Sequence, residues 1–371
     1  MPGELQSFLS LPAEAARRTG PLDQIVFSSR VRLARNIQGF SFPGWAKKPE
    51  RVRSLEVIRA AVEQLPALAG GFSETMDSLS ALEKQILVER HLISREHAAK
   101  SGGSGLVIDR SEGVCVMINE EDHLRMQALR PGLQLRQAWT AIDQLDSELE
   151  RKLSYAFSND WGYLTACPTN LGTGIRVSAM LHLPGLVLGE QINPIITSVN
   201  KLGLAVRGLY GEGTEALGNV FQVSNQMTLG ESETTIVERL EKVLSQIIEH
   251  EENARETLLE AKPKTVFNHI GRAYGVLANA HVISSKETMN LLSLMRLGVD
   301  LGLFQGAERS VVDELFILTQ PAHLQKQHSE KLSAEERDLL RADMVRDRLK
   351  NVSRPSPRTP PPSGLDKGGK E

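Results

Sequence analysis

Apolar and polar residues alternate in two regions in the way that β-strands require. Between residues 25 and 33 the apolar positions alternate with Arg30 and Arg32, which predicts a strand that presents both arginines on one face. The apolar runs 106–108 and 114–118 flank a short polar segment with the composition of a turn, and this arrangement predicts a hairpin.

Later in the chain the apolar period becomes helical. Apolar residues recur at helical spacing between 236 and 248, and the pattern stays helical from about 256 to 350. Ser333 and Glu336 form a capping box, which predicts a last helix that ends near Lys350. Strands first and helices later, without regular alternation, predict an α+β fold.

Composition divides the chain into four stretches. Residues 1–22 form a short lead-in, and residues 23–255 mix strand and helix patterns. Residues 256–352 form a helical C-terminal domain. Residues 353–371 are rich in Pro, Ser, Gly and Lys, cannot bury apolar area, and are expected to be a disordered tail.

Charge and cysteine content exclude several classes of protein. The chain has 371 residues with 43 Lys and Arg against 46 Asp and Glu, so no global positive field favours direct nucleic-acid binding. No run of about 18 apolar residues predicts a membrane span, and residues 1–20 lack the apolar core of a signal peptide. Cys115 and Cys167 form no CxxC motif, so we expect neither a zinc site nor a disulfide framework. We therefore expect a cytoplasmic protein.

Five arginines stand beside glycine turns or in polar clusters: Arg30, Arg32, Arg125, Arg176 and Arg207. Guanidinium groups bind phosphate oxygens through paired hydrogen bonds, and neighbouring glycines let backbone N–H groups approach the same oxygens. A polyphosphate is the natural ligand of such a set, although each arginine taken alone is more typical of a solvated surface charge. The chain has no P-loop, no GxGxxG after a strand and no protein-kinase motif, so arginines would have to replace the P-loop lysine.

Acidic residues occur in two of the same regions. Glu120, Glu121 and Asp122 follow the strand predicted at 114–118, and Glu212 lies in a Gly-rich loop. The carboxylates of the two regions would hold a cationic acceptor between them. The alternative for residues 120–122 is that they form a solvated turn at the end of the strand.

Four segments in this order resemble the signatures of the phosphagen (guanidino) kinases: SSRVRLARN at 28–36, NEEDHLR at 119–125, CPTNLGTG at 167–174 and RGLYGE at 207–212. The whole chain resembles the bacterial protein-arginine kinases more closely still, through residues 211–219 and 337–342. The resemblance implies a catalytic domain with an antiparallel sheet flanked by helices, followed by an all-α C-terminal domain.

Two departures from the kinases of free creatine or arginine point to a larger acceptor. Only 27 residues precede Ser28, where those enzymes have a helical domain that helps enclose the substrate, and a helical extension follows residue 255. A missing cover and an added domain favour an arginine side chain on a protein.

The resemblance implies a role for each motif residue. The ATP-binding residues would be Ser28, Ser29, Arg30, Val31, Arg32, His91, Arg125, Arg176, Val177, Ser178, Ala179, Met180, Arg207, Gly208, Leu209, Tyr210, Gly211 and Glu212. His91 has the alternative of an ordinary core or surface histidine. Mg²⁺ would bridge the phosphates, with mainly phosphate and water ligands and no direct side-chain ligand.

Glu121 and Glu212 would bind the acceptor guanidinium, and Glu121 is the preferred proton acceptor because a protonated guanidinium has no free lone pair. Asp122 either assists or only shapes the turn. Cys167 is either a thiol close to the acceptor, which would make activity sensitive to oxidation, or a small residue that shapes its loop. Cys115 is expected in a strand core.

Arg337, Asp338 and Arg341 should share one exposed helix face. They form either a charged solvent face or, as the resemblance implies together with Ala342, an allosteric site for phosphoarginine. The helical composition of this domain also fits a dimer interface.

The leading hypothesis is therefore transfer of phosphate from Mg-ATP to protein arginine in bacterial stress response and protein quality control. By resemblance alone, its partners would be a heat-shock repressor, clients of a Clp-type protease and an activating adaptor protein. The alternatives are a kinase of free arginine and a non-catalytic regulator that binds phosphoarginine.

Overall fold

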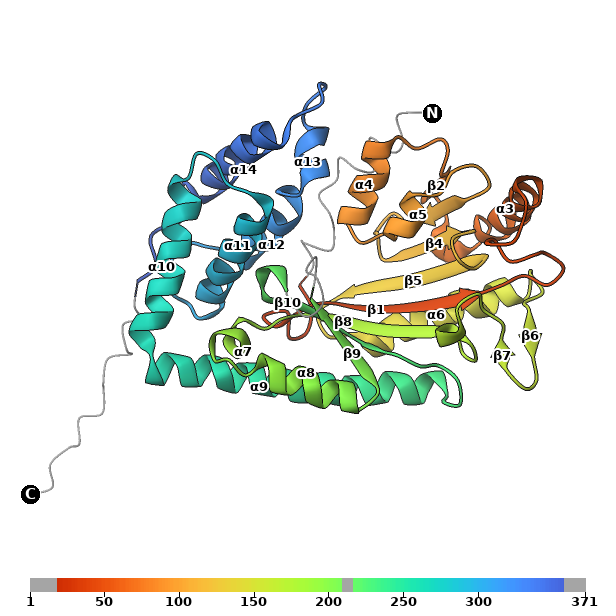
Figure 1. The fold of residues 1–371 in the computed structure, drawn as a ribbon, viewed down its shortest axis with the longest axis horizontal. Coiled ribbons are helices and arrows are strands. Elements are labelled where there is room, and N and C mark those ends of the chain that lie inside the picture. The colour runs from red at the N-terminus through yellow and green to blue at the C-terminus, as the bar shows by residue number, and fades with distance from the viewer. Residues whose placement is uncertain (1–18, 209–215, 357–371) are drawn as a thin grey trace, which may run out of the picture.

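An eight-stranded antiparallel sheet forms the centre of the protein in the computed structural model, which describes residues 19–208 and 216–356 (Figure 1). Its strands are β1 (Val26–Arg35), β2 (Phe72–Thr75), β3 (Gly105–Ile108), β4 (Val114–Ile118), β5 (Leu124–Pro131), β8 (Ile175–His182), β9 (Leu204–Gly208) and β10 (Val220–Asn225). They lie in the order β2-β3-β4-β5-β1-β8-β10-β9, so β1 is central. A separate small hairpin is formed by β6 (Phe157–Ser158) and β7 (Gly162–Tyr163).

Helices cover the two faces of the sheet unequally. One face packs against α3 (Lys48–Val62), α6 (Leu135–Glu150) and α9 (Glu233–Ala261), and encloses the largest apolar core. On the other face, α4 (Ala81–Glu89) and α5 (Arg95–Ala98) cover the β2–β4 end. Two short helices, α7 (Pro184–Leu188) and α8 (Ile192–Lys201), pack against α9 and β9 respectively.

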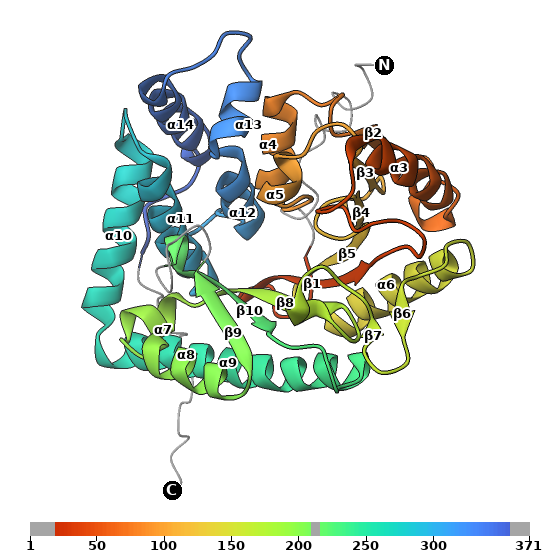
Figure 2. The same ribbon diagram turned by 45° about the vertical axis from the view of Figure 1, so that its right-hand side comes forward.

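The C-terminal helices form a second body with its own apolar core (Figure 2). They are α10 (Pro263–Asn279), α11 (Ser285–Asp300), α12 (Arg309–Leu318), α13 (Pro321–Lys326) and α14 (Ala334–Leu349). Helix α13 packs against α4 and α11 packs against residues 217–219. The second face of the sheet, over β1 and β8, therefore borders a cleft between α4 and the C-terminal helices.

The predicted elements are confirmed. The strand predicted at 25–33 is β1, the predicted hairpin is β3–β4, and the antiparallel sheet with flanking helices confirms the α+β fold class. Ser333 and Glu336 form the reciprocal capping box of α14. Helix α9 extends 13 residues beyond the apolar pattern at 236–248, because the buried ion pair of Glu251 and Arg255 continues its inner face.

Some expectations concern residues that the structure does not describe. Most of the lead-in (1–18) and most of the predicted tail (357–371) lie outside the described residues, and the four-part division of the chain stays a prediction. Among residues 19–208 and 216–356, no helix is both long and apolar enough to span a membrane.

Candidate active site

Strand register brings the predicted arginines of β1, β5 and β8 together. Arg32 of β1 lies directly opposite Arg176 of β8 and Gln127 of β5. Residues opposite each other in an antiparallel pair share a face, and so do residues two apart on one strand. Arg125, two residues before Gln127, and Arg30, two before Arg32, therefore lie on the same face as Arg176.

Arg207 joins this face from the edge of the sheet. It pairs with Gln222 of β10, which in turn pairs with Met180 of β8. The Gln222 side chain reaches back to the cluster, because its Oε1 accepts a hydrogen bond of 3.1 Å from Arg30 Nη2. The predicted five-arginine cluster thus spans four strands, and Gln222 is a member that the sequence gave no reason to single out.

The positive charges of these arginines repel one another. Burial, and then the charges of Arg125 and Arg176, lower the pKa of Arg30 to about 10. Burial and the same neighbours also lower the pKa of Arg32, whose Nε is buried without a hydrogen-bond partner. Burial and then Arg207 lower the pKa of Arg176. This donor set fits a polyanion, which would relieve the repulsion and occupy the free N–H groups.

Glu120 supplies the nearest counter-charge. It is buried and accepts hydrogen bonds from Arg125 and from the Ser94 hydroxyl. Burial alone would raise the pKa of Glu120, but Arg125 and the two hydrogen bonds lower it below its usual value. Glu120 therefore stays ionised and orients Arg125. The sequence pattern placed Glu120 in an acidic cluster without assigning this role. The signal for the pairing was the short turn between β4 and β5, which brings Glu120 close to Arg125 of β5.

The other two acidic residues of this motif have different environments. Glu121 is exposed, and partial desolvation and the nearby charge of Asp122 raise its pKa. Asp122 is buried and accepts hydrogen bonds from Asn36 Nδ2 at 2.6 Å and from the Ala166 N–H at 2.7 Å. Asp122 thus shapes the loop, while Glu121 is free to meet an acceptor. Glu212, Leu209, Tyr210 and Gly211 lie outside the described residues.

The loop held by Asp122 carries Cys167. This half-buried thiol lies 3.1 Å from the Thr169 hydroxyl, and it is close enough to Arg176 to offset part of the lowering of the pKa of that guanidinium. Cys115 is buried in β4, as expected, and burial raises its thiol pKa. Cys167 is therefore the thiol at the arginine cluster.

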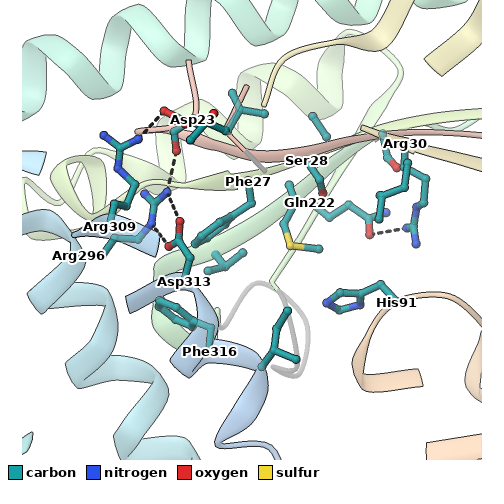
Figure 3. Close-up of a pocket in the computed structure, with 18 of the residues that line it drawn as sticks. Asp23, Phe27, Ser28, Arg30, His91, Gln222, Arg296, Arg309, Asp313 and Phe316 are labelled. Carbon is teal, nitrogen blue, oxygen red and sulfur yellow. Dashed lines mark hydrogen bonds and ion pairs between the residues drawn. The ribbon is translucent and has the colours of Figure 1, made fainter. Parts of the chain in front are cut away.

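His91 lies at the end of α4 and faces the cleft from the side opposite the C-terminal helices (Figure 3). Burial, and then the charge of Arg30, lower its pKa to about 4, so the ring is neutral at pH 7. The cleft holds about 1150 Å³ of empty space, including the part open to solvent.

Only some of the predicted nucleotide contacts line this cleft. Ser28, Arg30, His91, Ser178, Ala179 and Met180 do so. The side chains of Val31 and Val177 belong to the core on the opposite face, and the Ser29 hydroxyl donates to the Gly132 carbonyl. Successive side chains of a strand point to opposite faces of the sheet, so the side chains of these three residues point away from the cleft. Ser29, Val31 and Val177 can therefore offer a ligand only their backbone.

The expectation of one exposed face on the last helix is wrong for Arg341. Arg341 is only 1% exposed, and it donates to the Thr319 carbonyl at 2.8 Å, to the Ile283 carbonyl at 2.9 Å and to Asp338. Backbone carbonyls at the end of α12 and before α11 thus hold this charge inside the domain. Ala342 packs in the C-terminal core, and Arg337 donates to the Leu332 carbonyl.

No group of three or more His, Cys, Asp or Glu side chains within the described ranges is placed to hold a metal ion.

Comparison with known proteins agrees with this geometry. The profile of the ATP:guanido phosphotransferase C-terminal catalytic domain matches residues 55–254, and that of the protein-arginine kinase McsB C-terminal domain matches residues 263–360. Among solved structures, a lombricine kinase superposes with a TM-score of 0.55 at 25% identity, over 67% of this chain and 71% of that one. A duplicated taurocyamine kinase from Schistosoma mansoni, at 24% identity and a TM-score of 0.57, shares the fold over 89% of this chain and 43% of its own.

Curated relatives match over almost the full length. The protein-arginine kinase of Bacillus subtilis is 46% identical over 90% of this chain and 92% of its own. Those of Geobacillus sp. WCH70 and Halothermothrix orenii are 48% and 45% identical, over 90% and 89% of this chain and 93% and 94% of their own. The chain therefore belongs to the ATP:guanido phosphotransferase family and, within it, to the protein-arginine kinases.

Proposed function

We propose that this protein transfers the γ-phosphoryl group of Mg-ATP to arginine side chains of proteins. The observation that carries the proposal is the cluster of five arginines on one sheet face, next to the exposed carboxylate of Glu121. Such a cluster provides the positioning and charge stabilisation that phosphoryl transfer needs, while a carboxylate at its border binds a planar cation.

The side chains would act in the following way. The arginines hold the triphosphate, and their donors stabilise the charge on the equatorial oxygens of the γ-phosphoryl group. A guanidinium nitrogen of the acceptor forms a bond to the γ-phosphorus, the bond from phosphorus to the β,γ-bridging oxygen breaks, and ADP leaves. Glu121 accepts the proton that the nitrogen loses. Mg²⁺, when bound to the phosphates, neutralises part of their charge.

The acceptor is proposed to be a protein for two reasons. The relatives that align with about 90% of the chain are named protein-arginine kinases, and a C-terminal domain characteristic of them matches residues 263–360. Glu121 is also exposed, so a side chain that projects from a large molecule can reach it.

The decisive experiment is product analysis. The protein is incubated with Mg-ATP and either an arginine-rich protein or free arginine, and the products are identified by mass spectrometry at neutral pH. Phosphate on protein arginine supports the proposal, whereas phosphate on free arginine alone would make the protein a small-molecule guanidino kinase.

A pair of variants tests the role of Glu121. Glu121→Gln should lower kcat by about 10²–10⁴-fold without loss of nucleotide binding, because it removes the proton acceptor but no phosphate ligand. Glu96→Gln is the matched control, since Glu96 is another exposed carboxylate whose charge acts on Glu121. If Glu121→Gln abolished catalysis but left control of a repressor unchanged, a non-catalytic regulator that binds phosphoarginine would be the better description.

We further infer a cytoplasmic role in protein quality control. A heat-shock repressor, Clp-type protease clients and an adaptor protein are its proposed partners, and a homodimer is its proposed assembly. Arg337, Asp338, Arg341 and Ala342 remain the proposed phosphoarginine site, at which Arg341 would have to exchange its carbonyl partners for the phosphate. Pull-down of each partner and light scattering of the purified protein test these assignments separately.

A further inference from the structure

The C-terminal helices form one wall of the cleft that begins at the arginine cluster. Met289 of α11 and Asp313 and Phe316 of α12 line this wall, while Phe27 and Met180 line the sheet side. Figure 3 shows the two walls facing each other, with Arg30 at one end and Arg309 at the other.

The chemistry of the cleft changes along its length. At the end nearest the arginine cluster, Arg30 and Gln222 offer polar groups. Farther along, the rings of Phe27 and Phe316 meet edge to face with centroids 5.7 Å apart, and Met180 and Met289 add polarisable apolar surface. A ligand that matches both parts has a polyanionic end and an aromatic end, as a nucleoside triphosphate does.

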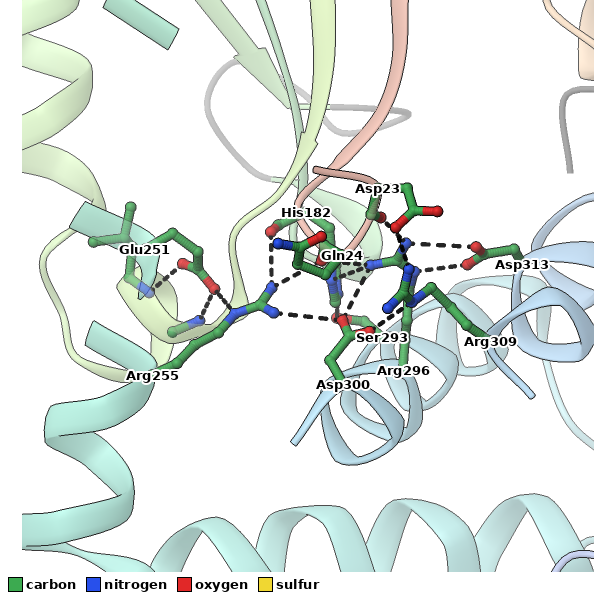
Figure 4. A network of polar contacts seen from close by, with 12 residues as sticks. Asp23, Gln24, His182, Glu251, Arg255, Ser293, Arg296, Asp300, Arg309 and Asp313 are labelled. Carbon is green, nitrogen blue, oxygen red and sulfur yellow. Dashed lines mark hydrogen bonds and ion pairs between the residues drawn. The ribbon is translucent and has the colours of Figure 1, made fainter. Parts of the chain in front are cut away.

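One ion pair and two hydrogen bonds to backbone carbonyls fix the C-terminal wall to the segment before β1 (Figure 4). Arg296 of α11 is 1% exposed, donates to the carbonyls of Asp23 and Gln24 at 2.7 and 2.9 Å, and pairs with Asp313 at 2.6 Å. Its guanidinium also lies 4.3 Å from the centre of the Phe27 ring.

Arg309 makes a second connection. It pairs with Asp300 of α11 at 2.7 Å and with Asp23, and the Asp23 pair crosses from the start of α12 to the segment before β1. If this wall moved away, the buried Arg296 guanidinium would lose the Asp23 and Gln24 carbonyls as acceptors, so the position of Phe316 against Phe27 is well defined.

We propose that the C-terminal helical domain completes the nucleoside-binding part of the active site, with Phe316 as a binding residue for the base. The proposal rests on the proposed function, because it assumes that the arginines hold the phosphates. It assigns α12 to substrate binding, so nucleotide binding and the placement of the C-terminal domain are thermodynamically linked.

The test compares a ligand that has a base with one that lacks it. The dissociation constants of Mg-ADP and of inorganic tripolyphosphate are measured by calorimetry for the full chain and for Phe316→Ala. Aromatic contacts to bases lose about tenfold or more in affinity on truncation to alanine, so the variant should bind ADP about tenfold more weakly and tripolyphosphate unchanged.

Phe304→Ala is the matched control. Phe304 and Phe316 are both 8% exposed in the C-terminal core, but Phe304 packs against Tyr274 and does not line the cleft. Equal weakening of ADP binding by both variants would overturn the proposal, as would equal weakening of both ligands by Phe316→Ala. If neither ligand bound the unaltered protein, the proposed function itself would fail.

Hydrogen exchange of the unaltered chain provides a second measurement that does not depend on a stable variant. ADP should slow amide exchange in α12 (Arg309–Leu318), whereas tripolyphosphate should slow it only near the arginine cluster. Protection of α12 by both ligands alike, or by neither, would contradict a base contact on this helix.

Discussion

Replacing one arginine of the cluster should stabilise the ligand-free protein. Arg30 is charged at pH 7 in both the folded and the unfolded state, but burial and its cationic neighbours lower its pKa from 12.5 to about 10 in the folded state. This difference corresponds to about 3.4 kcal/mol of destabilisation, which solvent screening of a half-buried group reduces to about 2–3 kcal/mol.

The change Arg30→Met removes this cost and keeps an apolar stem. It also removes the hydrogen bond to Gln222, which contributes about 1 kcal/mol. The free energy of unfolding of the variant should therefore be about 1–2 kcal/mol higher than that of the parent. In the absence of nucleotide this should raise the melting temperature by a few degrees. Mg-ADP should stabilise the parent protein but not the variant, because the variant has lost a phosphate ligand.

Thermal unfolding with and without Mg-ADP checks both parts of this prediction. Arg207→Met is the control, because Arg207 is exposed. This variant should also lose the stabilisation by Mg-ADP, but its melting temperature without nucleotide should equal that of the parent. The reasoning is refuted if Arg30→Met melts below the parent without nucleotide, or if ADP stabilises both proteins equally.

Three further predictions concern the acceptor side of the site. Because the pKa of Glu121 is raised and a proton acceptor must be ionised, kcat/KM should fall with decreasing pH at a value above the ordinary carboxylate pKa of 4.5, and Glu121→Gln should lack this limb. Asp122→Ala removes the acceptor of two hydrogen bonds, those from Asn36 Nδ2 and from the Ala166 N–H, so we expect about 2 kcal/mol less stability in denaturant unfolding as well as lost activity; lost activity at full stability would instead indicate a direct chemical role. Peroxide should inactivate the parent and Cys115→Ser alike but spare Cys167→Ser, measured as residual activity, and equal loss in all three would exclude Cys167 as the sensitive thiol.

The local part of this site could be predicted from the sequence. Alternation alone places Arg30 and Arg32 on one face of a strand, and the apolar pattern predicts the β3–β4 hairpin. The convergence of Arg32 with Arg176 depends on the register between β1 and β8, which is set by tertiary packing and which no local pattern contains. Only the family resemblance supplied that grouping beforehand.

Residues whose role depends on burial were the hardest to predict. The spacing of Arg337, Asp338 and Arg341 on a helix is correct, but spacing does not reveal that Arg341 meets two backbone carbonyls from other segments. Likewise, Glu121 and Asp122 are adjacent carboxylates in the sequence, and only the contacts of Asp122 with Asn36 and Ala166 show that it anchors a loop while Glu121 stays exposed.

The fastening of residues 23 and 24 by Arg296 constrains how chimeric enzymes can be assembled. The two carbonyls precede the first strand, whereas their donor lies on α11 of the C-terminal domain. A C-terminal domain transplanted from a relative would have to bring a lead-in that fits it, or those carbonyls would lose the Arg296 donor. Residues 23–24 and α11 should therefore come from the same parent, whereas a single crossover near residue 255 would separate them.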